Sequence, residues 1–187
     1  NLAAAFAPEL RYEWGDEVGR EPYWAARPVA ANDASTVTIA YLISYYIDTG
    51  STAWGCSVPP GNYLCPGHNG DSEAIILQVK YDDETENWVL SRAYYSQHTT
   101  YGIFKWGPQG YPAALAYPAR PGGYPRAFVA VGKHANYGSI SACNNGAFAA
   151  TDDCTHVDTS ERIFISAAYN VGSNAVRLID CVLSRDP

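Results

Sequence analysis

SEAIILQVKYDDETENWVLSRAYYSQH, residues 72–98, is the stretch of the sequence that decides the fold. Its two ends, 72–82 and 88–98, are rich in β-branched and aromatic residues, which are typical of strands. The polar segment DETEN at 83–87 lies between them. Two strand-like segments separated by a short polar turn predict a β-hairpin, and therefore an antiparallel sheet.

The same pattern continues on both sides of the hairpin. The segment STVTIAYLISYYID at 35–48 is the strongest further strand, and long loops rich in Gly and Pro follow it and the hairpin. We expect additional strands at 126–137, 161–171 and 174–184, an irregular segment at 1–35 and a loop at 139–159. The sequence therefore predicts one all-β domain over residues 1–187, an antiparallel, jelly-roll-like β-sandwich with long loops and little helix.

Composition limits the partners that this domain is expected to have. The chain has 187 residues, 15 of them Tyr, no Met and a formal net charge of −7. A negative chain is not expected to bind nucleic acid, and it is not drawn to anionic lipid by charge alone. No apolar run reaches the length of a membrane span. We expect a monomer, with peripheral membrane contact only through a specific head group.

The five cysteines predict loop disulfides. Cys56 and Cys65 bracket one loop, and Cys143 and Cys154 bracket another, so we expect these two pairs to be bonded. Cys181 remains and is expected to be a buried thiol. Disulfides favour an oxidising compartment, and therefore a secreted, extracellular protein. A start at Asn1 agrees with a processed secreted chain, although a trimmed chain would begin in the same way.

Histidines and acids recur where expected strands begin or end. His68 precedes one strand, and His98 and His134 stand at the ends of two others; Asp48 ends the strand at 35–48. In an antiparallel sandwich such positions can meet at one rim. Asp71 and Glu73 are two residues apart in a strand, so both should point to the same side.

Mixed His and carboxylate ligands suit a divalent cation, with Mg²⁺, Ca²⁺ or Mn²⁺ favoured over Zn²⁺. Each residue also has a simpler interpretation. A histidine at a strand end is often only a hydrogen-bonded rim residue, and HNGDSE at 68–73 could be a solvated turn. The fourth histidine, His156, lies in an acidic loop and is expected at the surface.

Several ordered motifs resemble the superfamily of necrosis-inducing (necrosis- and ethylene-inducing-like) proteins, and most closely its branch with a vacuolar-protein-sorting-like domain. They are SYYID at 44–48, GHNGDSE at 67–73, YYSQH at 94–98 and VAVGKHANY at 129–137. Within the second motif, Gly70 stands where the necrosis-inducing branch has its second His, as in the sorting-like branch. Ser72 departs from both branches, which have Trp there.

The resemblance implies a β-sandwich with a divalent cation at one end. Carried over by position, the metal ligands would be Asp48, His68, Asp71, Glu73 and His134, some of them through water, with His98 beside the site. Necrosis-inducing members are secreted toxins that recognise glycosylated sphingolipids at plant membranes and cause leakage. The resemblance thus suggests a toxin- or effector-like virulence protein that binds a glycan or glycolipid head group.

Three functions remain open from the sequence. In the first, the metal and the Tyr-rich loops bind a glycan or glycolipid head group without catalysis. In the second, a metal-bound water acts on a polysaccharide or phosphodiester, with His98 and Glu73 as acid and base, in a hydrolase or lyase. In the third, the metal only ties loops together in an interaction domain. No G-x-S-x-G, H-E-x-x-H or P-loop motif is present.

Overall fold

The computed structural model describes residues 2–14, 22–30, 32–48, 68–96, 124–145, 152–163 and 166–172. Its elements, in chain order, are α1 (Leu2–Ala5), β1 (Glu9–Tyr12), β2 (Tyr23–Ala30), β3 (Asp33–Asp48), β4 (His68–Asp82), β5 (Asn87–Tyr95), β6 (Arg126–Val129), β7 (Asn136–Tyr137), α2 (Ile140–Asn145), β8 (Thr159–Arg162) and the 3₁₀ turn η3 (Ala167–Tyr169). No helix among these residues is long and apolar enough to cross a membrane.

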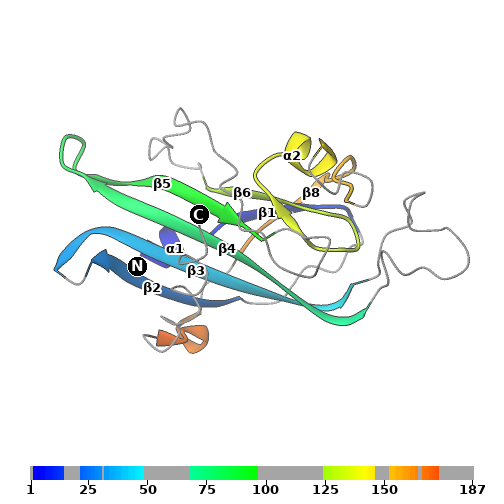
Figure 1. Cartoon of the computed structure of the whole chain (residues 1–187), viewed down its shortest axis with the longest axis horizontal. Helices are drawn as coiled ribbons and strands as arrows, with labels where there is room; N and C mark the ends of the chain where they lie inside the picture. The colour runs from blue at the N-terminus through cyan, green and yellow to red at the C-terminus, as the bar shows by residue number, and fades with distance from the viewer. Residues whose placement is uncertain are drawn as a thin grey trace, which may run out of the picture.

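The strands form two four-stranded sheets (Figure 1). The longer sheet is an antiparallel meander in the order β2-β3-β4-β5. The shorter sheet has the order β7-β6-β1-β8, in which β1 pairs parallel to β6 and antiparallel to β8. The expected all-β sandwich is confirmed, as is the hairpin of β4 and β5, whose turn is closed by bonds from the Glu84 amide and the Thr85 hydroxyl to Asp82.

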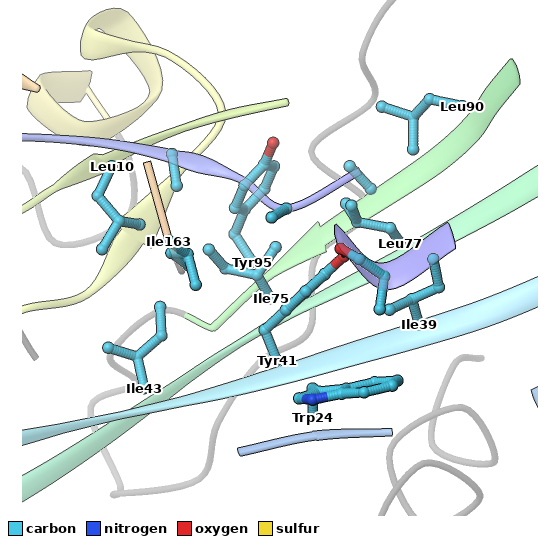
Figure 2. Close-up of a cluster of buried hydrophobic side chains, with 14 of the residues drawn as sticks. Leu10, Trp24, Ile39, Tyr41, Ile43, Ile75, Leu77, Leu90, Tyr95 and Ile163 are labelled. Carbon is cyan, nitrogen blue, oxygen red and sulfur yellow. The ribbon is translucent and has the colours of Figure 1, made fainter. Parts of the chain in front are cut away.

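The core lies between the two sheets. Alternate residues of β3 and β4 are buried, among them Ile39, Tyr41, Ile75 and Leu77, as the two-residue period of a strand requires. Leu10 and Ile163 contribute to the same cluster from the side of the shorter sheet (Figure 2). Each fully buried aliphatic side chain contributes about 1.5–3 kcal/mol to folding.

Four local expectations are wrong. The described part of residues 1–35 is not irregular but holds α1, β1 and β2. β2 is an edge strand, and its register shifts between Pro28 and Ala30, so Pro breaks the strand pattern without preventing pairing. The expected loop at 139–159 contains α2, where the Ser139 hydroxyl accepts a hydrogen bond from the Ala142 amide as an N-cap does.

The expected strand at 126–137 is also interrupted. β6 ends at Val129, and β7 begins only at Asn136. Between them Gly132 and His134 have φ of +68° and +60°, values that no strand residue adopts. The expected strand at 161–171 is likewise replaced after Arg162 by the 3₁₀ turn η3. The expected strand at 174–184, including Cys181, lies outside the described residues.

The Tyr41 hydroxyl ties α1 to the core. Tyr41 is fully buried and donates a 2.8 Å hydrogen bond to the Ala3 carbonyl. We predict that Tyr41→Phe lowers the free energy of unfolding by about 1–2 kcal/mol, because this buried bond is lost. Urea denaturation measures the change, and Tyr23→Phe at a half-exposed edge position is the control, expected within about 0.5 kcal/mol of wild type. Equal losses of unfolding free energy in Tyr41→Phe and Tyr23→Phe would contradict a stabilising role for the Tyr41 hydroxyl.

Candidate functional site

The core face of β4 changes from apolar to acidic toward the start of the strand. Residues 79, 77 and 75 are buried and apolar, and the next two positions on that face are Glu73 and Asp71. Glu73 is fully buried, and the Asp71 side chain is 9% exposed. The prediction that the two carboxylates share one side of a strand is therefore confirmed, and that side faces the inside of the sandwich.

His134 joins Asp71 from the turn between β6 and β7. Its Nδ1 lies 3.4 Å from Asp71 Oδ2, which is an ion pair when the ring is protonated. The imidazole stacks on the Tyr45 ring with centroids 3.9 Å apart and an interplanar angle of 4°. Tyr45 is also the cross-strand partner of Asp71 in the β3–β4 ladder. A left-handed backbone at a non-glycine residue costs about 1–3 kcal/mol, so the contacts around His134 must hold it there.

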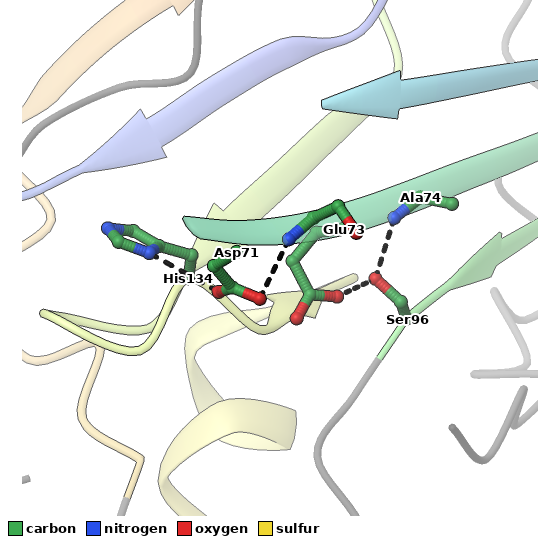
Figure 3. A network of polar contacts seen from close by, with 6 residues as sticks. Asp71, Glu73, Ala74, Ser96 and His134 are labelled. Carbon is green, nitrogen blue, oxygen red and sulfur yellow. Dashed lines mark hydrogen bonds and ion pairs between the residues drawn. The ribbon is translucent and has the colours of Figure 1, made fainter. Parts of the chain in front are cut away.

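Glu73 is held by the end of β5 (Figure 3). The Ser96 hydroxyl donates to Glu73 Oε2 and accepts a 2.8 Å hydrogen bond from the Ala74 amide. The other oxygen, Oε1, is buried and has no hydrogen-bond partner among the described residues. Burial raises the pKa of Glu73 well above its ordinary value, and the charges of Asp71 and Asp152 add to that effect, while Ser96 and His134 oppose it.

A second group of buried polar residues lies beside the site and was not found from the sequence. Tyr137 donates a hydrogen bond to Asp152 Oδ2, and Lys133 Nζ lies 3.8 Å from Asp152 Oδ1. All three are buried, as is Asn136. Burial, Asp152 and Glu73 together raise the pKa of the Tyr137 hydroxyl, so it acts as a donor throughout the ordinary pH range. Lys133 and Asn136 flank His134 in VAVGKHANY, but nothing in that pattern indicates which side chains are buried.

A disulfide holds Asp152 against the turn that carries His134. Cys143 and Cys154 are bonded, as predicted, with Cα atoms 6.0 Å apart. Both are fully buried in a small cluster with Ala135 and Tyr137. The Val131 amide also donates a 2.9 Å hydrogen bond to the Asp153 carbonyl. The segment after α2 is thereby fixed at the site from two directions.

The remaining predicted site residues are less completely placed. Asp48 and His68 are backbone partners at the end of the β3–β4 ladder, three positions beyond Asp71, but their side chains lie outside the described part. His98, Cys56 and Cys65 fall in segments that are not described. His156 is exposed, as expected. Ser72 is exposed on the face of β4 opposite Glu73, so this departure from the resembled motif does not alter the buried cluster.

The donor types fit a hard divalent cation, but the arrangement is incomplete. Within the described ranges, no group of three or more His, Cys, Asp or Glu side chains is arranged to hold a metal ion. Glu73 nevertheless offers a carboxylate oxygen without a hydrogen-bond partner among the described residues, beside Asp71 and His134, and a cation bound there would be a large local charge that favours the ionised carboxylate. A full coordination shell would need Asp48, His68 or water as well.

Comparison with known proteins gives no relative for this chain: no family model, no curated protein and no solved structure matches it. The resemblance to the necrosis-inducing superfamily therefore stays a prediction from motifs.

Buried Glu73 predicts a specific pH dependence in cation-free protein. The folded state has the higher Glu73 pKa and binds more protons, so the contribution of this group to stability is full below its ordinary pKa of 4.5 and is lost as pH rises toward the folded value. We predict that Glu73→Gln, in chelator at pH 8, exceeds wild type in free energy of unfolding by at least about 1 kcal/mol. The difference should shrink toward pH 4.5.

Urea denaturation at several pH values measures this difference. Glu84→Gln in the exposed hairpin turn is the matched control and should follow wild type at every pH. A Glu73→Gln protein that is less stable than wild type at pH 8 would show that the carboxylate is ionised and well paired in the fold.

Loss of the disulfide is expected to loosen the segment that carries Asp152. The double variant Cys143→Ala/Cys154→Ala should lose about 2–3 kcal/mol of unfolding free energy, because the bond closes a short loop in the unfolded chain. Denaturation in urea checks the value. A loss under about 0.5 kcal/mol would mean that packing of the surrounding cluster alone keeps the segment in place.

Proposed function

We propose that this protein binds a divalent cation, Mg²⁺, Ca²⁺ or Mn²⁺, at the end of the sandwich where β4 begins. Asp71, Glu73 and His134 would hold it, with Asp48 and His68 completing the shell. The observation that carries this proposal is Glu73, a fully buried carboxylate with one oxygen lacking a hydrogen-bond partner among the described residues.

Charge balance supports a cation at this position. Burying a carboxylate is costly unless an opposite charge or hydrogen bonds compensate. Asp71 and Asp152 add negative charge near Glu73, whereas Lys133 lies against Asp152 and His134 against Asp71. A divalent cation would offset the repulsion among the carboxylates and allow Glu73 to ionise.

The bound cation would in turn serve to recognise a glycan or glycolipid head group. A hard cation at a protein rim supplies positive charge to which sugar hydroxyls coordinate. Asp71 is the carboxylate nearest to solvent, since its side chain is 9% exposed, whereas Glu73 is fully buried. The ligand would therefore approach from the side of Asp71. This mode fits a secreted, toxin- or effector-like protein that touches membranes only through a specific head group.

Binding without catalysis is favoured over a hydrolase or lyase by the burial of Glu73. A side chain with no exposed surface does not reach a bond in a polysaccharide or phosphodiester, although a small ion can contact it. The buried disulfide between Cys143 and Cys154 supports secretion, and the net charge of −7 disfavours nucleic acid as the partner.

Cation titration with an Asp71 variant tests the proposal. Isothermal titration of chelator-treated protein with Ca²⁺, Mg²⁺ and Mn²⁺ should show one site in wild type. Asp71→Asn should weaken it at least about tenfold, since even residues that only support ligands change affinity about 10–100-fold. Asp83→Asn, at the exposed tip of the hairpin, keeps the same change in charge and should bind normally.

The glycan part is tested with an array of glycans and glycolipids, with and without chelator. Retention of the protein on an array member supports recognition if it requires the cation and is lost in Asp71→Asn. If wild type cleaves an array member and Asp71→Asn does not, the protein is a hydrolase or lyase rather than a binding protein. No heat of cation binding in wild type would refute the proposed site.

A further inference from the structure

Asn136 is a buried polar residue whose side chain lacks hydrogen-bond partners in the described part of the chain. Its side chain is fully buried, yet neither its amide nitrogen nor its amide oxygen has a hydrogen-bond partner among the residues described. Leaving one buried polar group unsatisfied costs about 1–3 kcal/mol. An amide that lacks partners at both ends therefore points to a water, ion or ligand at this position.

Strand pairing turns Asn136 toward the core between the two sheets, which Glu73 faces from the opposite sheet. Asn136 of β7 lies directly opposite Val129 of β6, and residues directly opposite in a ladder project to the same side. Val129 belongs to the main core between the sheets, together with Ile75 and Leu77 of the Glu73 face of β4. Tyr137, the next residue, instead joins the small cluster around the disulfide.

One residue, Ser96, contacts both the backbone of Asn136 and the side chain of Glu73. The backbone amide of Asn136 donates a 2.8 Å hydrogen bond to the Ser96 carbonyl, and the Ser96 hydroxyl donates to Glu73 Oε2. Glu73 Oε1 is the other buried oxygen of this group that has no hydrogen-bond partner in the described ranges. The two residues that carry unsatisfied buried atoms are thus both anchored to Ser96, the residue after β5.

The burial decides what can occupy this position. Asn136 and Glu73 both have 0% exposure, so a sugar ring does not reach them, whereas an ion or a water molecule does. Amide and carboxylate oxygens are the ligands that hard divalent cations prefer. Thiolate is absent from the pair, which disfavours a softer metal.

We propose that Asn136 is a cation ligand, whose side-chain oxygen forms the inner wall of the site together with Glu73 Oε1, directly or through one water. This inference rests on the proposed function. Asp71 and His134 then form the outer wall, toward solvent. The inner oxygens set the preference of the site for Ca²⁺, Mg²⁺ or Mn²⁺ over Zn²⁺, because they add hard donors to a set that contains histidine.

The variant Asn136→Leu tests this assignment, since Leu has a similar size and no polar atom. In chelator, its stability in urea should equal or exceed that of wild type, because an unsatisfied buried amide is removed. Its affinity for Ca²⁺ and Mn²⁺, measured by isothermal titration, should fall at least about tenfold. The rise in melting temperature that saturating Ca²⁺ causes in wild type should shrink accordingly.

Thr38→Val is the matched control. Thr38 of β3 is 1% exposed, and its hydroxyl has no hydrogen-bond partner in the described part of the chain, but it pairs with Gln78 in the middle of the sheet. In chelator, Thr38→Val should change the stability in urea as Asn136→Leu does, but it should leave the cation affinity unchanged. Equal loss of affinity in both variants would overturn the assignment, because the effect would then be a general one.

A second variant keeps the test decisive if Asn136→Leu does not fold. Asn136→Asp adds a buried negative charge, so we expect lower stability in chelator and tighter Ca²⁺ binding than wild type. Wild-type cation affinity in either Asn136 variant overturns the inference. If Asn136→Leu is also less stable than wild type in chelator, the role of Asn136 is purely structural.

The proposed function can fail separately from this inference. If Asp71→Asn abolishes cation binding while the Asn136 variants bind normally, only the inference about Asn136 fails. If wild type binds no cation, the proposed function fails with it.

Discussion

The ladder between β3 and β4 is the interaction on which the rest of the structure depends. Its register runs without a shift from Thr36–Lys80 to Asp48–His68, across the core and out to the end of the sandwich (Figure 1). Side chains alternate along it, so one face carries both the apolar core and the carboxylates of Glu73 and Asp71. A slip of one residue would move Glu73 to the outer face and bring Ser72 inside, which would remove the core and the site together.

The site is accordingly built as a continuation of the core rather than as a surface feature. Its carboxylates are buried by the same sheet packing that buries Ile75 and Leu77. Ser96 donates a hydrogen bond to Glu73, His134 lies against Asp71, and Lys133 lies against Asp152. Buried polar networks of this kind are strongly affected by the loss of any one member, because the low dielectric strengthens satisfied contacts and penalises unsatisfied ones. The unsatisfied atoms at Glu73 and Asn136 are therefore the most informative features of the cluster.

Much of the architecture could be predicted because local sequence and packing agree there. The three central strands β3, β4 and β5 are long and rich in β-branched and aromatic residues. A polar turn joins β4 to β5. β1 and β2 were missed because they are an isolated short segment and an edge strand with Pro28; both are strands only through their partners. The break after Val129 was missed because its apolar pattern continues through a turn at Gly132 and His134.

The sequence by itself determined the all-β class, the hairpin, the common side of Asp71 and Glu73 and the Cys143–Cys154 pair, since period, turn composition and loop length are local properties. Only the tertiary structure decided that this side faces inward, that His134 reaches Asp71 from a left-handed turn, and that Asp152 lies near Glu73 with Lys133 against it. These facts depend on contacts between segments that lie far apart in the chain, and such contacts follow from how two sheets pack, which no local pattern encodes.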